Sequence, residues 1–136
     1  MLIVIIDDNS TVLLTLEAKL KASKAIQDWD TLYKFRTADE FIKHFRFGKD
    51  NDYGIVICDH DLGPDQMKGY EVINLIQKEG YKNKAILFTA DDSTALNIKM
   101  TFKRHVDYVV KSNERGENDS SFILSKLIAE ARDLSS

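Results

Sequence analysis

The stretch Ile55-Val56-Ile57-Cys58-Asp59-His60-Asp61-Leu62 decides how this chain folds. A short, uninterrupted apolar run that ends in carboxylates is typical of a buried strand whose last residues reach the edge of a sheet. Burying an ionised carboxylate without a partner is costly, so Asp59 requires a cation or hydrogen bonds close by. We therefore expect the functional site at this end of the strand. The glycine and the only proline in residues 63–68 predict a loop, and Gly69 opens the next helical pattern.

The composition is that of an ordinary globular protein. The 136 residues are 43% apolar and 30% charged, which suits one domain, 1–136, with a single core. A net charge of -3 argues against direct binding of nucleic acid, which favours basic surfaces. The single cysteine, Cys58, excludes an intrachain disulfide, and no apolar run approaches the length of a bilayer span. We expect a cytoplasmic protein without a membrane partner.

Strand and helix patterns alternate along the chain, with no internal repeat and no linker. Predicted strands lie at 2–6, 29–35, 55–59, 85–88 and 108–110. Helical patterns lie at 10–24, from Thr37 onward, at 70–78, more weakly at 93–102, and at 122–134. Five strands separated by helices predict an α/β fold, in which a parallel sheet is covered by helices on both faces. Functional residues then lie at the carboxyl ends of the strands.

Local patterns place several of these elements more closely. Asn9 or Ser10 can cap the first helix, and Thr37 and Glu40 have the spacing of a capping box. The alternation from Trp29 to Phe35 is typical of a half-exposed strand at a sheet edge. In the last helix we expect an inward stripe with neighbours on its flank, formed by Ile123, Leu127, Ala131 and Leu134 beside Leu124 and Ile128.

Five polar residues lie at the carboxyl ends of predicted strands and therefore meet at one edge of the sheet: Asp7, Asp8, Asp59, Thr89 and Lys111. Three carboxylates held this close repel one another, which favours a bound cation, and an oxygen-only site prefers a hard ion such as Mg²⁺. With the metal bound, Asp59 can attack phosphorus as a nucleophile. The Lys111 ammonium, the Thr89 hydroxyl and the backbone N–H of Ala90 can then hold the phosphoryl oxygens.

This arrangement resembles the receiver domain of two-component response regulators over essentially the full length of the chain. The residues that carry the resemblance are Asp7-Asp8, Asp59, Thr89-Ala90 and Lys111. The resemblance implies a flavodoxin-like (βα)5 fold, doubly wound, with five parallel strands in the order 2-1-3-4-5. It also implies phosphorylation of Asp59 by a sensor histidine kinase or a histidine phosphotransfer protein, with relay to a downstream effector that the sequence does not identify.

The resemblance further implies a role for each residue of the site. Mg²⁺ is expected on Asp8, Asp59 and the backbone carbonyl of Asp61, with Asp7 contributing through water. Thr89 and Tyr108 are expected to form the switch pair, with Tyr108 turning from an exposed to a buried position on phosphorylation. The changed surface would include the helix at 93–102, with Lys103 and Arg104 at its edge. A homodimer that forms on phosphorylation is a further partner that the resemblance allows.

Two departures from the family pattern stand out. Gly69 lies ten residues beyond Asp59, which is a longer gap than usual and predicts an enlarged loop beside the site. Ser112 follows Lys111 where most members of the family carry proline. Asp61 and Asp91 add negative charge at variable positions beside the site, so they bear on the lifetime of the phosphoryl group.

Two other function classes compete with a phosphoacceptor module. A pseudo-receiver would bind a partner without being phosphorylated, and the intact set of five polar residues disfavours it. Asp59-His60-Asp61 also matches the DxD start of haloacid dehalogenase-type phosphatases. Those enzymes carry the motif on an early strand, whereas Asp59 ends the third predicted strand here. We therefore expect no turnover of an external substrate.

Overall fold

The computed structural model describes residues 1–49, 51–90, 102–112 and 119–135. Within these ranges the chain forms five β strands and four α helices. The strands are β1 (Leu2–Ile6), β2 (Thr31–Phe35), β3 (Ile55–Asp59), β4 (Lys84–Thr89) and β5 (Asp107–Val110). The helices are α1 (Ser10–Ala22), α2 (Ala38–Phe47), α3 (Gly69–Lys78) and α5 (Ser120–Ser135).

The strands form one parallel sheet in the order β2-β1-β3-β4-β5, which confirms the predicted flavodoxin-like topology. From β1 the chain crosses to β2 on one side, and after α2 it returns to β3 on the other side. The connections therefore leave the sheet in opposite directions at β1 and β3. Such a topological switch point is where open α/β sheets place their functional groups, at the carboxyl ends of the strands.

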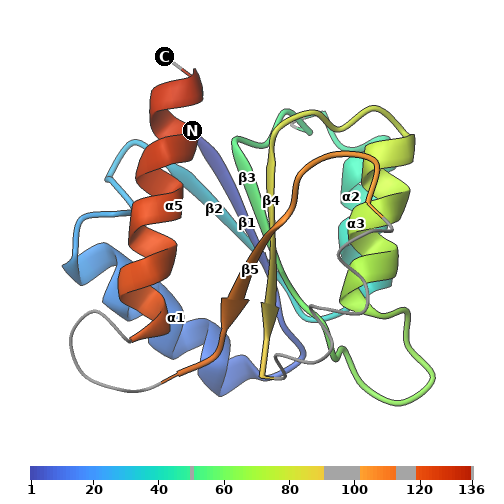
Figure 1. Ribbon diagram of the computed structural model, residues 1–136, viewed down its shortest axis with the longest axis horizontal. Coiled ribbons are helices and arrows are strands. Elements are labelled where there is room, and N and C mark those ends of the chain that lie inside the picture. The colour runs from blue at the N-terminus through green and yellow to red at the C-terminus, as the bar shows by residue number, and fades with distance from the viewer. Residues whose placement is uncertain (50, 91–101, 113–118, 136) are drawn as a thin grey trace.

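The sheet lies between two helical layers, α1 and α5 on one face and α2 and α3 on the other (Figure 1). Alternate residues of the two central strands pack against opposite layers. Those that face α1 and α5 are Ile3, Ile5, Ile55 and Ile57. Those that face α2 and α3 are Val4, Ile6, Val56 and Cys58. Because both faces are covered, these strands read as continuous apolar runs.

The helix ends follow the expected capping chemistry. The Asn9 side chain accepts hydrogen bonds from the backbone N–H groups of Thr11 and Val12, at 3.0 and 3.2 Å. The Thr37 hydroxyl accepts from the backbone N–H of Glu40 at 3.2 Å. After α3, Gly80 adopts a φ of +105°, a left-handed conformation that glycine tolerates without strain. Each of the four described helices therefore begins within two residues of the start that the sequence predicts.

The prediction that β2 begins at Trp29 is wrong. The strand starts at Thr31, and the Trp29 side chain is 73% exposed. Between them, the Asp30 side chain is buried because two cations hold it: the Met1 ammonium at 3.1 Å and the Arg132 guanidinium at 2.6 Å. The alternating pattern extended too far because it took no account of this buried ion-pair cluster. The edge position of β2 is confirmed.

The inward stripe of α5 also differs from the prediction. Leu124, Ile128 and Ala131 are buried, whereas Ile123 is 36% and Leu134 is 80% exposed. The predicted stripe (Ile123, Leu127, Ala131 and Leu134) and the buried one (Leu124, Ile128 and Ala131) both have helical spacing, and they are adjacent on the helix. The packing of α5 against β5 and α1 selects the one centred on Ile128.

The helix predicted at 93–102 falls almost wholly on residues outside the described ranges. Its last residue, Phe102, is described and packs against Tyr108 with ring centroids 6.3 Å apart. None of the helices in the described part of the chain combines the length and apolar character that a membrane crossing requires.

Candidate functional site

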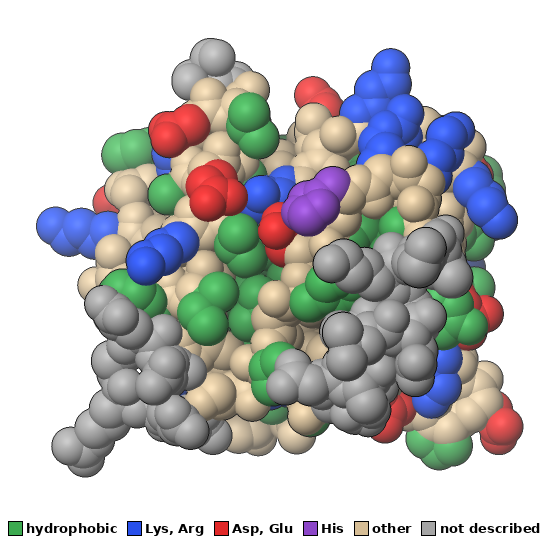
Figure 2. Space-filling model, in the orientation of Figure 1, with side chains coloured by type: hydrophobic (Ala, Val, Ile, Leu, Met, Phe, Trp, Pro, Cys, Tyr) green, Lys and Arg blue, Asp and Glu red, His purple; other side chains and the backbone are tan. Residues whose placement is uncertain are grey.

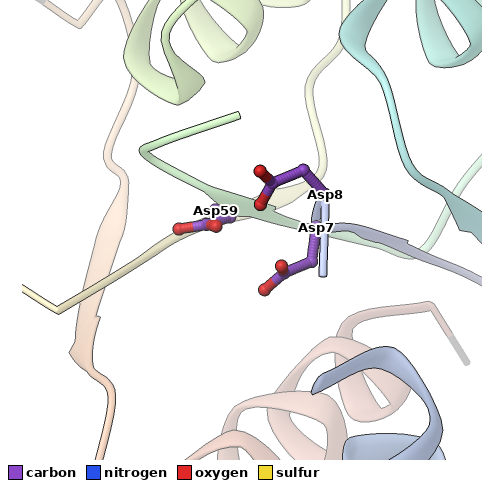
Figure 3. A group of neighbouring side chains, drawn as sticks. All are labelled: Asp7, Asp8 and Asp59. Atoms are coloured by element: carbon purple, nitrogen blue, oxygen red, sulfur yellow. The ribbon is translucent and has the colours of Figure 1, made fainter. Parts of the chain in front are cut away.

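Three carboxylates converge at the switch point between β1 and β3. Asp7 is 1% and Asp59 is 6% exposed, whereas Asp8 is exposed to solvent. Asp7 points toward the side of α1 and α5, and Asp8 toward the opposite side of the sheet (Figure 3). One oxygen from each of the three lies within 4.8 Å of the others. Among the described residues, this is the one acidic cluster compact enough to hold a metal ion.

Lys111 supplies the cation that this cluster needs. Its Nζ atom lies 3.0 Å from Asp7 Oδ2 and 3.1 Å from Asp59 Oδ2. The same Nζ atom lies over the ring of Phe88, 5.1 Å from the ring centroid. The backbone N–H of Lys111 donates to the carbonyl of Thr89 at 2.8 Å, which continues the pairing of β5 with β4. The residue that directly follows β5 is therefore held against the carboxylates at the ends of β1 and β3.

Burial and charge act on Asp59 in opposite directions. The pKa of its carboxyl is raised to about 6, against an ordinary value of 3.8, and burial is the largest cause. The nearby Lys111 lowers this pKa, and the Asp7 charge raises it again. For Lys111, burial lowers the pKa, but hydrogen bonding to Asp7 and the charge of Asp59 outweigh that effect and raise it. Asp59 is thus an ionised carboxylate at neutral pH that is held at a free-energy cost.

Backbone groups complete the environment of the carboxylates. Asp7 Oδ1 accepts from the backbone N–H of Asn9 at 2.9 Å, and Asp59 Oδ1 accepts from that of Asp61 at 3.4 Å. The start of α3 is very close to the site, because a Cβ on Gly69 would lie 2.2 Å from the carbonyl oxygen of Asp59. Only glycine fits there. Residues of the loop at 60–68 line the same pocket as the carboxylates.

The expected switch residues lie on the other face of the sheet. Thr89 is 3% exposed and follows Ala85 and Leu87 on the face toward α3. Tyr108 lies opposite Leu87 in the register, so it is one pleat away from Thr89 on this face. The expectation of an exposed Tyr108 is wrong in this structure: the ring is half-buried, and its hydroxyl is buried with no hydrogen-bond partner among the described residues.

The surface predicted around Lys103 and Arg104 is only partly free. Lys and Arg side chains gather above α3 at the upper right of the space-filling view (Figure 2). Lys103 is exposed, but the Arg104 guanidinium donates to the backbone carbonyl of Tyr81 at 3.1 Å and to that of Gln77 at 3.5 Å. Arg104 therefore ties the segment before β5 to the end of α3.

Several residues near the carboxylates were not singled out as functional by their sequence pattern. Lys68 and Gly63 line the same open pocket of about 770 Å³ as the carboxylates, Thr89, Ala90 and Lys111. Asn9 was expected only as a helix cap. One feature of the sequence could have indicated them. The long gap between Asp59 and Gly69 predicted an enlarged loop beside the site.

Ser112 takes the position where proline is usual in the family. Its backbone N–H donates to Ser120 Oγ at 3.1 Å, and the same hydroxyl donates to the Ser112 carbonyl at 2.7 Å. The peptide bond between Lys111 and Ser112 is trans. Ser120, at the start of α5, thus uses the N–H group that a proline would lack.

The donor set fits a hard divalent cation. All three clustered ligand atoms are carboxylate oxygens, the type that Mg²⁺ and Ca²⁺ prefer. Cys58, which precedes Asp59, carries a thiol, a softer type of metal ligand. Its side chain is buried on the face of β3 opposite Asp59, and burial raises the pKa of the thiol. A buried nucleophilic carboxylate, a bridging lysine and an oxygen-only cation site together can support the transfer of a phosphoryl group.

Comparison with known proteins identifies the family. A family model described as the response regulator receiver domain matches residues 3–119. The chain belongs to this family. No curated protein matches the receiver chain in sequence.

Solved structures share the receiver fold at low sequence identity. The response regulator TrrA from Thermotoga maritima, in complex with Mg²⁺ and beryllium fluoride, is 23% identical, with a TM-score of 0.71 over 96% of this chain and 97% of that one. The beryllium-fluoride-activated DrrB receiver domain is 22% identical, with a TM-score of 0.68 over 97% of each chain.

A third structure comes from a longer protein. The N-terminal domain of a three-domain response regulator, sensory box and GGDEF protein from Carboxydothermus hydrogenoformans is 20% identical. Its TM-score is 0.74 over 99% of this chain and 96% of that one. At these identities the likeness shows the fold alone.

The raised pKa of Asp59 predicts a pH-dependent gain of stability in Asp59→Asn. The folded-state pKa of about 6 exceeds the ordinary 3.8, so ionisation of this carboxyl costs folding free energy. That cost is absent below the lower value, grows between the two, and is complete above the higher one. Asp59→Asn should therefore stabilise the protein by roughly 1–3 kcal/mol above about pH 7 and by much less near pH 4.

Urea unfolding across this pH range measures the difference between variant and wild type. Asp65→Asn, at the exposed tip of the loop after β3, is the matched control and should show no such step. A gain for Asp59→Asn that does not change with pH would contradict the assignment of the pKa to burial of this carboxyl.

Proposed function

We propose that this chain is a phosphoacceptor module of a cytoplasmic two-component phosphorelay. Asp59 accepts a phosphoryl group from a phosphohistidine on a sensor histidine kinase or a histidine phosphotransfer protein. The modified domain then presents a changed surface to a downstream effector or to a second copy of itself. The chain turns over no external substrate beyond its own phosphorylation and dephosphorylation.

The observation that supports this proposal most strongly is the bridging position of Lys111. Its Nζ is shared between Asp7 and Asp59, at 3.0 and 3.1 Å. A lysine that served only to neutralise one buried acid would need no second carboxylate at the same distance. In this position Lys111 can follow the negative charge from the Asp59 carboxylate to phosphoryl oxygens attached to it, without leaving Asp7.

The proposed chemistry is a direct displacement at phosphorus. An oxygen of the Asp59 carboxylate forms a bond to phosphorus, and the bond from phosphorus to the donor imidazole nitrogen breaks. The electron pair of that bond stays on the nitrogen, which takes up a proton, and the product is an acyl phosphate. The Thr89 hydroxyl, the backbone N–H of Ala90 and the Lys111 ammonium then bind the phosphoryl oxygens. Hydrolysis of the acyl phosphate by water restores Asp59.

Mg²⁺ is the proposed cofactor. Asp8, Asp59 and the backbone carbonyl of Asp61 would hold it directly, and Asp7 would contribute through water. Bound Mg²⁺ would neutralise charge on the phosphoryl oxygens during transfer. The exposed position of Asp8 suits this role, because a cation can reach it from solvent while Asp7 and Asp59 remain buried.

A pseudo-receiver that binds its partner without phosphorylation is the alternative. It would have no need for an acid whose ionisation costs folding free energy beneath an open pocket, as Asp59 does. The DxD phosphatase alternative is disfavoured by the fold, because the motif ends the third strand of a receiver domain.

The proposed switch couples Thr89 to Tyr108 across the pair β4 and β5. A phosphoryl group adds roughly -1.5 to -2 charge and strong acceptor oxygens at the site, so nearby donors move toward it. Movement of the Thr89 hydroxyl would open space on its face of the sheet. Tyr108 is one pleat away, and its buried hydroxyl has no hydrogen-bond partner among the described residues. A buried hydroxyl without a partner costs free energy, which favours movement of Tyr108 to a position where the hydroxyl is bonded.

Acetyl phosphate labelling tests the acceptor directly. Wild type should be labelled in the presence of Mg²⁺, and Asp59→Asn should not, because an amide is a poor nucleophile. Asp65→Asn, which changes one exposed acid on the neighbouring loop, should be labelled like wild type. Labelling that persists in Asp59→Asn would move the acceptor elsewhere, and an unlabelled wild type would favour the pseudo-receiver.

Thermal unfolding with and without Mg²⁺ tests the cation ligands. Binding to the folded state alone should raise Tm by about 3–6 °C at roughly tenfold excess over the dissociation constant. Asp8→Ala should abolish this rise, because it removes the solvent-facing ligand while leaving the buried Asp7 and Asp59 in place. The ligand assignment is wrong if Asp8→Ala keeps the Mg²⁺-dependent rise in Tm.

Beryllium fluoride, a mimic of the phosphoryl group, tests the switch. With Mg²⁺ it should shift the backbone NMR signals of Thr89 and Tyr108 more than those of Leu20 and Lys21, at the far end of α1. Asp59→Asn with the same additions serves as the control for non-specific shifts. Equal or reversed perturbation would reject the proposed coupling while leaving the phosphosite intact.

A further inference from the structure

Lys68 lies at the rim of the pocket that holds the three carboxylates. It lines this pocket together with Asp8, Asp59, Asp61 and Lys111. Its Nζ is 3.8 Å from Asp61 Oδ1, and the two side chains are 45% and 77% exposed. An exposed ion pair at this separation contributes little to stability, so little free energy is needed to part it.

The loop that carries Lys68 is fixed at both ends. Leu62 is 3% exposed and Met67 packs against the same core as α2 and α3. Between them, Gly63 adopts a φ of +109°, and its carbonyl accepts from the backbone N–H of Gln66 at 3.3 Å. Asp61 Oδ1 accepts from the Gly63 N–H at 3.1 Å. The backbone position of Lys68 is therefore set, although its side chain is free to move.

The side chain of Lys68 has no structural task at the start of α3. The backbone N–H of Lys68 donates to Glu71 Oε1 at 3.1 Å, and its carbonyl accepts from the N–H of Val72 at 3.1 Å. Lys68 makes no side-chain capping bond. Replacing its side chain should leave the first turn of the helix intact.

The charges around the pocket leave room for a second cation. Among the described residues, four carboxylates line it, those of Asp7, Asp8, Asp59 and Asp61, against two lysines, Lys68 and Lys111. Lys111 is already shared between Asp7 and Asp59, on the buried side. A phosphodonor is an anion and must approach from the open side, where the exposed Asp61 repels it and Lys68 attracts it.

We propose that Lys68 is a second phosphoryl-binding cation, which exchanges Asp61 for the oxygens of an incoming phosphodonor and then of the phosphoryl group on Asp59. This inference rests on the proposed function of Asp59. Lys111 and Lys68 then bind the group from opposite sides, one from the sheet and one from the enlarged loop. The longer gap between Asp59 and Gly69 is what carries a lysine to this position.

The experiment compares Lys68→Met with Lys78→Met. The second variant removes an exposed lysine from the last turn of the same helix, away from the pocket. With acetyl phosphate and saturating Mg²⁺, Lys68→Met should lower the labelling rate constant by about three- to tenfold, from the loss of one charge near a dianion in water. Lys78→Met should label at the wild-type rate. Lys68→Arg, which keeps the positive charge, should retain most of the wild-type rate. High salt should shrink the effect of Lys68→Met.

Asp61→Asn tests the exchange step. It frees Lys68 from its partner, so it should speed labelling in the wild-type background and do so less in the Lys68→Met background. Equal acceleration in both backgrounds would show that Asp61 acts by repulsion alone and would overturn the exchange. An unchanged rate in Lys68→Met would overturn the role of Lys68 while leaving Asp59 as acceptor. A wild type that is not labelled would instead refute the proposed function.

Discussion

Two carboxylates at neighbouring strand ends can stay buried here because Lys111 Nζ lies between them, 3.0 Å from Asp7 and 3.1 Å from Asp59. Each carboxylate alone would have to be protonated or exposed. The order of the strands places Lys111 within reach, because the lysine directly follows β5 and its Nζ lies over the ring of Phe88 on the neighbouring strand β4. The compensation is incomplete, since the pKa of Asp59 is still raised to about 6. The site is therefore electrostatically strained before any ligand arrives, and a divalent cation or a phosphoryl group would both change that balance.

The backbone near the site supports the buried carboxylates. The Asn9 and Asp61 N–H groups donate to the carboxylates, and Gly69 lets α3 begin against the carbonyl of Asp59. Because a Cβ at position 69 would lie 2.2 Å from that oxygen, the loop can return over the site only with glycine there. Rigid strands and tightly held loop ends thus surround a pocket whose exposed side chains, Asp8 and Lys68, can still rearrange.

The fold and the position of the carboxylates could be predicted from the sequence because they depend on its clearest patterns, the uninterrupted apolar runs. The runs before Asp7 and Asp59 are apolar at every position, which is typical of parallel strands buried on both faces. The carboxyl ends of such strands lie at the same edge of the sheet. Weaker periodicity failed where a tertiary contact decided. The alternating strand pattern included Asp30, whose side chain is instead buried against two cations. Arg104, expected at the edge of a changed surface, donates to the backbone carbonyls of Gln77 and Tyr81. The position of Lys68 depends on the path of an irregular loop, which no periodic pattern encodes.

Alternation along the strands places Lys111 and the buried carboxylates on one face of the sheet and the proposed switch residues on the other. Asp7, Asp59 and Lys111 continue the positions of Ile5, Ile57 and Val109, all of which face α1 and α5. Thr89 and Tyr108 belong to the opposite face, toward α3. In the proposed function the Thr89 hydroxyl would link the two faces by binding the phosphoryl group, and the backbone hydrogen bond from the Lys111 N–H to the Thr89 carbonyl, 2.8 Å long, connects the same two strand ends. In the proposed function, a shift of Lys111 toward the phosphoryl group would pull on the same strand end that carries Thr89. Both links act on the residues at the carboxyl ends of β4 and β5, so the proposed coupling requires a change in how these last residues are held and no motion of the sheet itself.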